Sequence, residues 1–211
     1  MSPAAPAGLD KIRIVVDSAL HVTDTLGRFR AAYPEVFIQL HTGNSEEVLR
    51  MLRDYEAEIG VVGSLDPEPD LITVDLGSAP IRAVAARGFL PSRVTELHLN
   101  DLSRWPLIFR EKGSRTRLAL EQAAEAQGVE LAPVMEVDGR EAMREIVSSG
   151  AGIGFVSEAE FGTDPRLVQV PLTGVELRMT ETLVYLAIRR EVPVISAFMK
   201  VLRETTNHGD R

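Results

Sequence analysis

The sequence predicts an α/β protein built from two similar units. Apolar, β-rich runs alternate with helical patterns, this alternation occurs twice along the 211 residues, and polar turns follow the strands. Hydrophobic residues make up 45% of the chain and charged residues 26%, which is ordinary for a globular protein with a sizeable core. A chain of this length forms one large domain or two small ones.

Composition excludes several classes of site and partner. The chain has no cysteine, which rules out disulfides, thiolate metal sites and cysteine nucleophiles. Its net charge of −8 makes it a poor nucleic-acid binder, because duplex affinity rests on basic residues. No apolar run approaches a membrane span, and the N-terminus lacks the basic start and apolar core of a signal peptide. We expect residues 1–10 to be a flexible leader.

The first unit reads as β-α-β-α-β followed by a fourth strand. Apolar runs predict strands at 12–16, 36–40, 58–62 and 71–76, separated by helical patterns at 22–33 and 45–55. Pro34 ends the first helix. Ser45 is expected to cap the second helix, with Glu46 and Glu47 in its first turn. Such alternation is typical of a parallel sheet with crossover helices.

The second unit repeats this architecture. A strand at 81–86 leads out of the first unit, and a short helical piece at 97–102 follows. Strands are predicted at 107–110, 134–137, 153–156, 167–172 and 182–188, with helices at 115–127 and 140–149. A final helix at 193–203 is free to return to the first unit. Gly128 and Gly150 are placed to end the first two of these helices. We expect one subdomain from residues 11–82 plus 188–211 and the other from residues 83–187.

The candidate ligand contacts lie in the turns after strands. In open α/β sheets, ligands bind at the carboxyl ends of strands, and two units joined by two crossings are expected to form a cleft between them. The residues expected to contact a ligand are Ser18, His21, Thr42, Asn44, Ser64, Lys112, Gly113, Ser114, Arg115 and Asp138.

The turn 110–117 carries the chemistry of an anion site. Its glycine lets the backbone approach a ligand, its Ser114 can cap the following helix, and the free N–H groups of a helix start favour an anion. Four basic residues in this turn add positive charge, namely Arg110, Lys112, Arg115 and Arg117. The alternative is a capped helix with solvated cations. Asp138, or Glu111, is positioned to meet an ammonium group, although Asp138 equally suits a helix cap.

Catalytic and cofactor motifs are missing. The sequence contains neither GxSxG nor HExxH, and its four histidines are scattered without a local metal-binding pair. The glycines at 150, 152 and 154 follow a helix and precede a strand, an order that predicts a tight turn rather than a dinucleotide fingerprint. We therefore expect no catalytic residue, metal or cofactor.

Several segments together resemble the effector-binding domain of a LysR-type transcriptional regulator. They are residues 12–18, Leu26–Arg30 with Tyr33–Val36, residues 40–43, the 58–62 strand, Asp138-Gly139, and 146–154, which is similar to the pattern V..G.GI...P. The last helix from Pro193 completes the resemblance, which runs from about Lys11 to Arg203.

The resemblance implies a cytoplasmic sensor with two Rossmann-like subdomains and a ligand cleft between them, as in periplasmic-binding-protein-like folds of type 2. It also implies a homodimer or homotetramer, no membrane partner, and DNA contact only through an N-terminal helix-turn-helix that these residues do not include. The run 109–117 is also similar to a subgroup associated with 2-aminoethylphosphonate catabolism. Other interpretations are a solute-binding protein of a transporter, or a two-domain enzyme using the same cleft.

Overall fold

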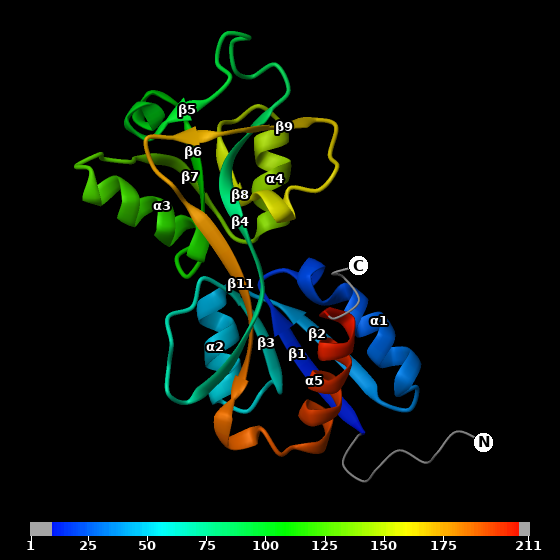
Figure 1. Ribbon diagram of the computed structural model, residues 1–211. Coiled ribbons are helices and arrows are strands. Elements are labelled where there is room, and N and C mark those ends of the chain that lie inside the picture. Colours follow the sequence, from blue (N-terminus) through cyan, green and yellow to red (C-terminus); the bar gives the residue numbers. More distant parts are fainter. Residues whose placement is uncertain (1–9, 207–211) are drawn as a thin grey trace. The chain divides into compact units, whose positions relative to one another are not determined.

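The computed structural model describes residues 10–206, which fall into two compact units (Figure 1). Unit 1 runs up to Leu76 and resumes at Glu181, and unit 2 is Gly77–Thr180. Both boundaries fall inside long strands, β4 (Leu71–Ala86) and β11 (Arg178–Leu186). The sequence analysis predicted that the chain passes between the two subdomains further along, at 82/83 and at 187/188. Except for Asp10, the expected leader lies outside the described residues.

The sheet of unit 1 is mixed rather than wholly parallel. Strands β1 (Lys11–Val16), β2 (Phe37–Thr42) and β3 (Ile59–Gly63) are parallel, in the order β2-β1-β3. Strand β11 then joins β3 in the antiparallel direction. The predicted parallel pairing is confirmed for the first three strands, whereas β11, which was expected in the second unit, adds an antiparallel strand. The carboxyl ends of the three parallel strands share one edge of the sheet.

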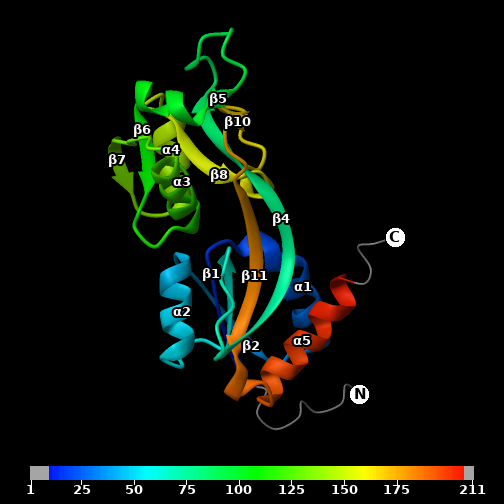
Figure 2. The same ribbon diagram turned by 60° about the vertical axis from the view of Figure 1, so that its left-hand side comes forward.

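Helices cover both faces of this sheet. Helices α1 (Thr23–Ala32) and α5 (Pro193–Thr206) lie on one face, and α2 (Ser45–Arg53) lies on the other (Figure 2). On the first face, the rings of Phe29 and Phe198 lie 5.3 Å apart, and both side chains are fully buried. On the second face, α2 packs so closely on β3 that a Cβ at Gly60 would lie 2.6 Å from Val48 Cγ1.

Unit 2 is built around β4 and a parallel group of strands. β4 pairs antiparallel with β8 (Gly154–Ser157) and β9 (Leu167–Val170). β6 (Leu107–Arg110) pairs in parallel with β7 (Pro133–Val137), and a parallel bridge joins Leu107 to Ile153, next to β8. The carboxyl ends of β6, β7 and β8 therefore share one edge. The short strands β5 (Leu97–His98) and β10 (Leu172–Thr173) form a separate pair.

Two helices enclose the core of unit 2. Helix α3 (Arg115–Ala126) buries Leu120 with Phe109 and Phe155, whereas α4 (Arg140–Ser148) buries Met143 with Val156. Gly128 and Gly150 follow these helices with φ values of +67° and +85°, which confirms their predicted role in ending them. No described helix is long and apolar enough to cross a membrane.

Two local predictions differ from the structure. The strands expected at 71–76 and 81–86 are one continuous strand, β4, which passes through Gly77 at φ +126°. The piece expected to be helical at 97–102 begins as β5 and becomes the 3-10 helix Leu99–Arg104. A glycine and a proline lie between the two halves of β4, and both can occupy a strand that bends.

Candidate functional site

Asp17 links the segments at the carboxyl ends of the parallel strands of unit 1, which we call its carboxyl edge. It follows β1, and its Oδ2 accepts hydrogen bonds from the Gly63 N–H at 2.8 Å and from the Ser45 hydroxyl at 3.2 Å. Ser45 is buried, and its hydroxyl also accepts the Gly63 N–H at 3.2 Å, so its side chain is directed at the strand ends rather than at its own helix. The cap of α2 is Asn44, whose side chain accepts the N–H of Glu47 at 3.0 Å. The prediction that Ser45 caps this helix was wrong by one residue.

The other candidates of unit 1 lie at the same edge. Ser18 is buried just after β1, and its side chain does not cap the following 3-10 helix, Ala19–Val22. His21 lies in that 3-10 helix, with Nε2 3.7 Å from Oε1 of the buried Glu181. Thr42 is the exposed last residue of β2. Ser64 follows β3 with φ +36°, a left-handed conformation that is uncommon for a residue with a side chain.

The carboxyl edge of unit 2 contains the turn 111–114 and the start of α3. Gly113 adopts φ +93°, which a residue with a Cβ rarely does, and allows the chain to turn from β6 into the helix. Ser114 stands at the N-cap position, but its side chain forms no cap hydrogen bond. It is 3% exposed, and its Oγ has no hydrogen-bond partner among the described residues. The predicted capping role of Ser114 is therefore wrong.

Two arginines of this turn are neutralised by carboxylates. Arg110 donates to Glu111 at 2.6 and 3.0 Å, and both side chains are largely buried. Arg117 donates to Glu121 at 2.8 Å and to Glu136 at 2.6 Å. The guanidinium groups of Arg110 and Arg117, which were expected to contribute positive charge to an anion site, are therefore already paired with carboxylates.

The carboxylate of Glu111 likewise already has hydrogen-bond partners. Burial alone would raise its pKa, but the hydrogen bonds from Arg110 and from the Gly139 N–H at 3.0 Å outweigh burial and lower the pKa below its usual value. A carboxylate held in this way is not available for the ammonium group that the sequence analysis considered for it.

Two charged residues at the edge, Arg115 and Asp138, remain for a ligand. Within residues 10–206, the half-buried Arg115 and the exposed Asp138 form no side-chain ion pair or hydrogen bond. Lys112 is exposed between Glu111 and Gly113. Asp138 does not cap α4, because the N-cap position belongs to Gly139. Arg115 can thus meet an anion, and Asp138 can meet an amine.

Sequence reasoning missed Ser157. It is the last residue of β8, is 0% exposed, and its Oγ has no hydrogen-bond partner within the described part of the chain. Its position at a strand end could have drawn attention to it. Nothing in the neighbouring sequence, however, shows that its hydroxyl would be left unpaired.

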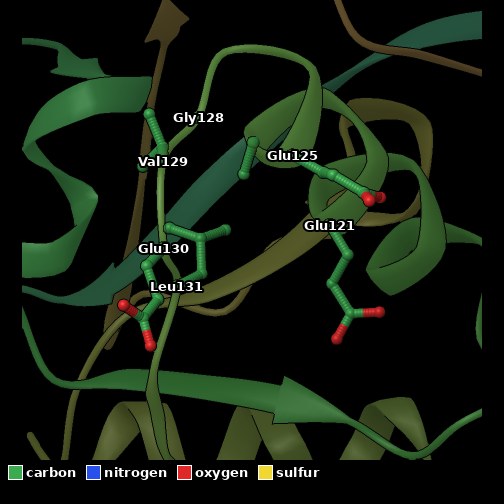
Figure 3. Close-up of a pocket in the computed structure, with 7 residues that line it drawn as sticks. Glu121, Glu125, Gly128, Val129, Glu130 and Leu131 are labelled. Carbon is green, nitrogen blue, oxygen red and sulfur yellow. The ribbon is translucent and has the colours of Figure 1, made fainter.

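A surface pocket lies at the other end of α3 (Figure 3). Its rim carries the carboxylates of Glu121, Glu125 and Glu130, and Val129 and Leu131 add apolar surface. The carbonyls at a helix C-terminus and three carboxylates disfavour an anion. This pocket is therefore separate in place and in charge preference from the edge that holds Ser114.

Comparisons with known proteins match nearly the whole described chain. A family model described as "LysR substrate binding domain" matches residues 9–207. The HTH-type transcriptional regulator CbbR of Rhodospirillum rubrum is 27% identical over 200 residues, which cover 93% of this chain and 66% of that regulator. The phosphonates import ATP-binding protein PhnC of Anaeromyxobacter dehalogenans (strain 2CP-C) is 32% identical over 204 residues, 95% of this chain and 41% of that protein. The chain thus spans less than two thirds of either relative's length.

Among solved structures, the regulatory domain of Synechocystis PCC6803 CcmR in complex with 2-PG has the same fold. The TM-score is 0.81 at 22% identity, and the alignment covers 93% of this chain and 97% of that domain. The predicted α/β fold class is confirmed by this similarity.

Proposed function

Because this chain belongs to the family of LysR substrate-binding domains, we propose that it binds a small anionic or zwitterionic metabolite as the sensing part of a transcriptional regulator. The earlier resemblance is confirmed at the level of this family. We assign the chain a binding role and no reaction. The name of the CbbR relative, an HTH-type transcriptional regulator, supports a DNA-binding region elsewhere in a longer protein, for which we propose a cytoplasmic location.

One observation carries the proposal for the ligand, namely the Ser114 hydroxyl at the start of α3, which has no hydrogen-bond partner within residues 10–206. Buried polar groups in folded proteins nearly always have a partner, and the Ser114 Oγ, which lies at a helix start, has none among the described residues, so this hydroxyl is available to donate to a ligand. The first turn of a helix adds free N–H groups and a positive dipole end. Arg115 supplies a cation that has no partner among residues 10–206. Together these groups favour an oxyanion.

The remaining candidates are proposed as further ligand contacts. In unit 2 they are Lys112 and Gly113 for an anionic group and Asp138 for an ammonium group. In unit 1 they are the side chains that line its carboxyl edge, namely Ser18, His21, Thr42, Asn44 and Ser64. Asn44 is the weakest of these, because its side-chain oxygen already accepts the N–H of Glu47.

For the effector we propose a small oxyanion, with a phosphonate as one specific candidate. The names of two similar proteins support this class, since one structure holds 2-PG and one relative is a phosphonates import protein. A zwitterion such as 2-aminoethylphosphonate would use the anion groups at Ser114 and the carboxylate of Asp138.

We propose that a second copy of this chain pairs along α1 and β2. β2 is the outer strand of the unit 1 sheet, and it leaves Phe37 62% and Leu40 39% exposed. Exposed apolar side chains on an edge strand favour association. Analytical ultracentrifugation of the 211-residue chain should show a dimer or tetramer, and a monomer at high concentration would refute this part of the proposal.

The test of the ligand proposal is a thermal-shift screen with inorganic phosphate, sulfate, 2-aminoethylphosphonate, 2-PG and benzoate. A ligand at a hundred times its Kd stabilises the folded chain by about 2.7 kcal/mol, which gives a clear increase in Tm. We expect at least one anion to raise Tm and Arg115→Ala to reduce that increase. An increase that Arg115→Ala leaves unchanged would move the site to unit 1. If no anion raises Tm, the proposed effector class is wrong.

A further inference from the structure

Ser157 and Ser114 are two buried hydroxyls at the same edge of unit 2. Ser157 ends β8, and Ser114 precedes α3 after the turn that follows β6. β6 and the residues that lead into β8 run in parallel, with Ile108 N–H donating to the Ile153 carbonyl at 2.8 Å. The carboxyl end of each strand therefore points the same way.

The alternation of β8 places Ser157 on the side of the sheet that α3 covers. Ile153 and Phe155 pack in the core with residues of α3, and the Phe155 ring lies 6.0 Å from that of Phe109. Gly154 instead faces α4, since a Cβ there would lie 2.3 Å from Met143 Sδ. Successive side chains of a strand point to opposite faces, so Ser157 shares the face of Ile153 and Phe155.

Both hydroxyl oxygens are enclosed and lack a hydrogen-bond partner among the described residues. Ser157 is 0% exposed and Ser114 is 3% exposed, and each adjoins a half-buried or exposed residue, Glu158 or Arg115. The nearby carboxylate of Glu158 lies 3.4 Å from the Arg82 guanidinium, which offsets its charge.

The carboxylate of Glu160 is likewise balanced, because it lies 2.7 Å from Arg140. The residues that follow Ser157 therefore do not present an unbalanced negative charge to an anion. The pattern V..G.GI...P, aligned on Val147, has proline where this chain has Ser157, and proline has no hydroxyl to donate.

We propose that Ser157 is a specificity-determining residue that donates a hydrogen bond from Oγ to the oxyanion group of the effector, beside Ser114 and the start of α3. This inference rests on the proposed binding function and adds a donor that the sequence analysis did not assign. Hydrogen bonds to charged groups are among the stronger ones, so loss of this donor should weaken binding about ten- to a hundredfold.

The test compares the 211-residue protein with Ser157→Ala by isothermal titration calorimetry and thermal unfolding, using the tightest-binding anion of inorganic phosphate, sulfate, 2-aminoethylphosphonate, 2-PG and benzoate. We expect Kd to rise about ten- to a hundredfold. We also expect the Tm of the free protein to stay equal or rise, because an unpaired buried hydroxyl is removed. A hydroxyl with only a structural role gives the opposite pattern, a lower Tm and an unchanged Kd.

Thr173→Val is the matched control. Thr173 Oγ1 is also buried without a partner in the described region, but it adjoins Gly174, whose carbonyl accepts from Gln127 at the far end of α3. That end lies about 18 Å from the Ser114 end for a helix of 12 residues. The control should leave Kd unchanged.

The outcomes separate the two proposals. If the unmodified protein binds and Ser157→Ala binds equally well, the role of Ser157 is refuted and the binding function stands. If the unmodified protein binds none of the anions, both proposals fail. If Ser157→Ala does not fold, Ser157→Cys decides, because it keeps the size and weakens the donor. A raised Kd with native circular dichroism supports the inference, and an unchanged Kd refutes it.

Discussion

Removing the charge of Glu58 should destabilise unit 1 more than removing one partner of a surface ion pair would. The carboxylate is 5% exposed and precedes β3. It accepts the Arg13 N–H at 2.7 Å, the Arg13 guanidinium at 2.6 and 3.2 Å, and the Arg189 guanidinium at 3.2 Å. Arg189 belongs to the 3-10 helix Ala187–Arg189 before α5, so this cluster joins β1, β3 and the approach to α5.

The expected loss for Glu58→Gln is about 2–3 kcal/mol at pH 7. Hydrogen bonds to charged groups contribute about 1.5–3 kcal/mol each, and loss of one partner of a buried pair costs about 3–5 kcal/mol. We take a value below that range because the Arg13 side chain is 32% exposed and water can hydrate it after the substitution.

The loss should depend on pH. Burial raises the pKa of Glu58, but the hydrogen bonds from Arg13 and Arg189 outweigh burial and lower the pKa. A lowered pKa gives stability that is fully present above the unfolded value of about 4.3 and disappears as pH falls through the folded value. The difference between the two proteins should therefore be largest at pH 7 and shrink as the pH falls below about 4.

Urea unfolding followed by far-UV circular dichroism measures this difference. The only tryptophan, Trp105, lies in unit 2, so its fluorescence alone would not follow unit 1. Asp24→Asn is the control: its partner Arg28 is 48% exposed and Asp24 is 68% exposed, and the expected loss is under about 0.5 kcal/mol. A Glu58→Gln loss equally small at pH 7, or one that is the same at pH 3, would refute the reasoning.

Three further predictions concern packing and capping in unit 1. Gly60→Ala should destabilise it by about 1–3 kcal/mol, because the new Cβ would lie 2.6 Å from Val48 Cγ1, and an unchanged urea midpoint would contradict this. Asn44→Ala should lower the stability by about 1 kcal/mol, because it removes the hydrogen bond that the side chain accepts from the Glu47 N–H. Ser45→Gly should leave that cap intact. If the Asn44 variant keeps the helicity of the unmodified protein throughout thermal unfolding, the assignment of the cap is contradicted. Phe29→Ala should lose about 3–5 kcal/mol because the ring is 0% exposed, and calorimetry showing under about 1 kcal/mol would mean that the core repacks.

The order of elements was predictable because each strand and helix carries its own periodicity. The direction of β11 was not predictable, because residues 182–188 have the pattern of an apolar strand whether they run parallel or antiparallel to their neighbour. The continuity of β4 was also missed, because Gly77 and Pro80 resemble a break in sequence and are accommodated within the strand. Periodicity predicts local structure, whereas pairing direction depends on contacts distant in sequence.

The site was harder to predict, because whether each side chain is available to a ligand depends on which other side chains it contacts. The pair Arg117–Glu121 has helical i,i+4 spacing and could have been read from the sequence, but the bond from Arg117 to Glu136 depends on β6 lying beside β7. A basic turn therefore looked more positive in sequence than it is in the structure. The reverse error affected Ser157, because only the fold shows that its hydroxyl is enclosed.

These partners change how the edge of unit 2 would recognise an anion. Arg110 and Arg117 are held by carboxylates, so this edge offers the hydroxyls of Ser114 and Ser157, helix N–H groups and Arg115 rather than a broad cluster of cations. The chain as a whole is acidic, with a net charge of −8, and long-range attraction of an anion is weak. In the proposed site, recognition would then rest on short-range donors, which act only when the oxygens of a ligand fit their positions. A buried donor without its partner carries a desolvation penalty, so the proposed site would reject an anion of the wrong shape at the same hydroxyls that would hold the right one.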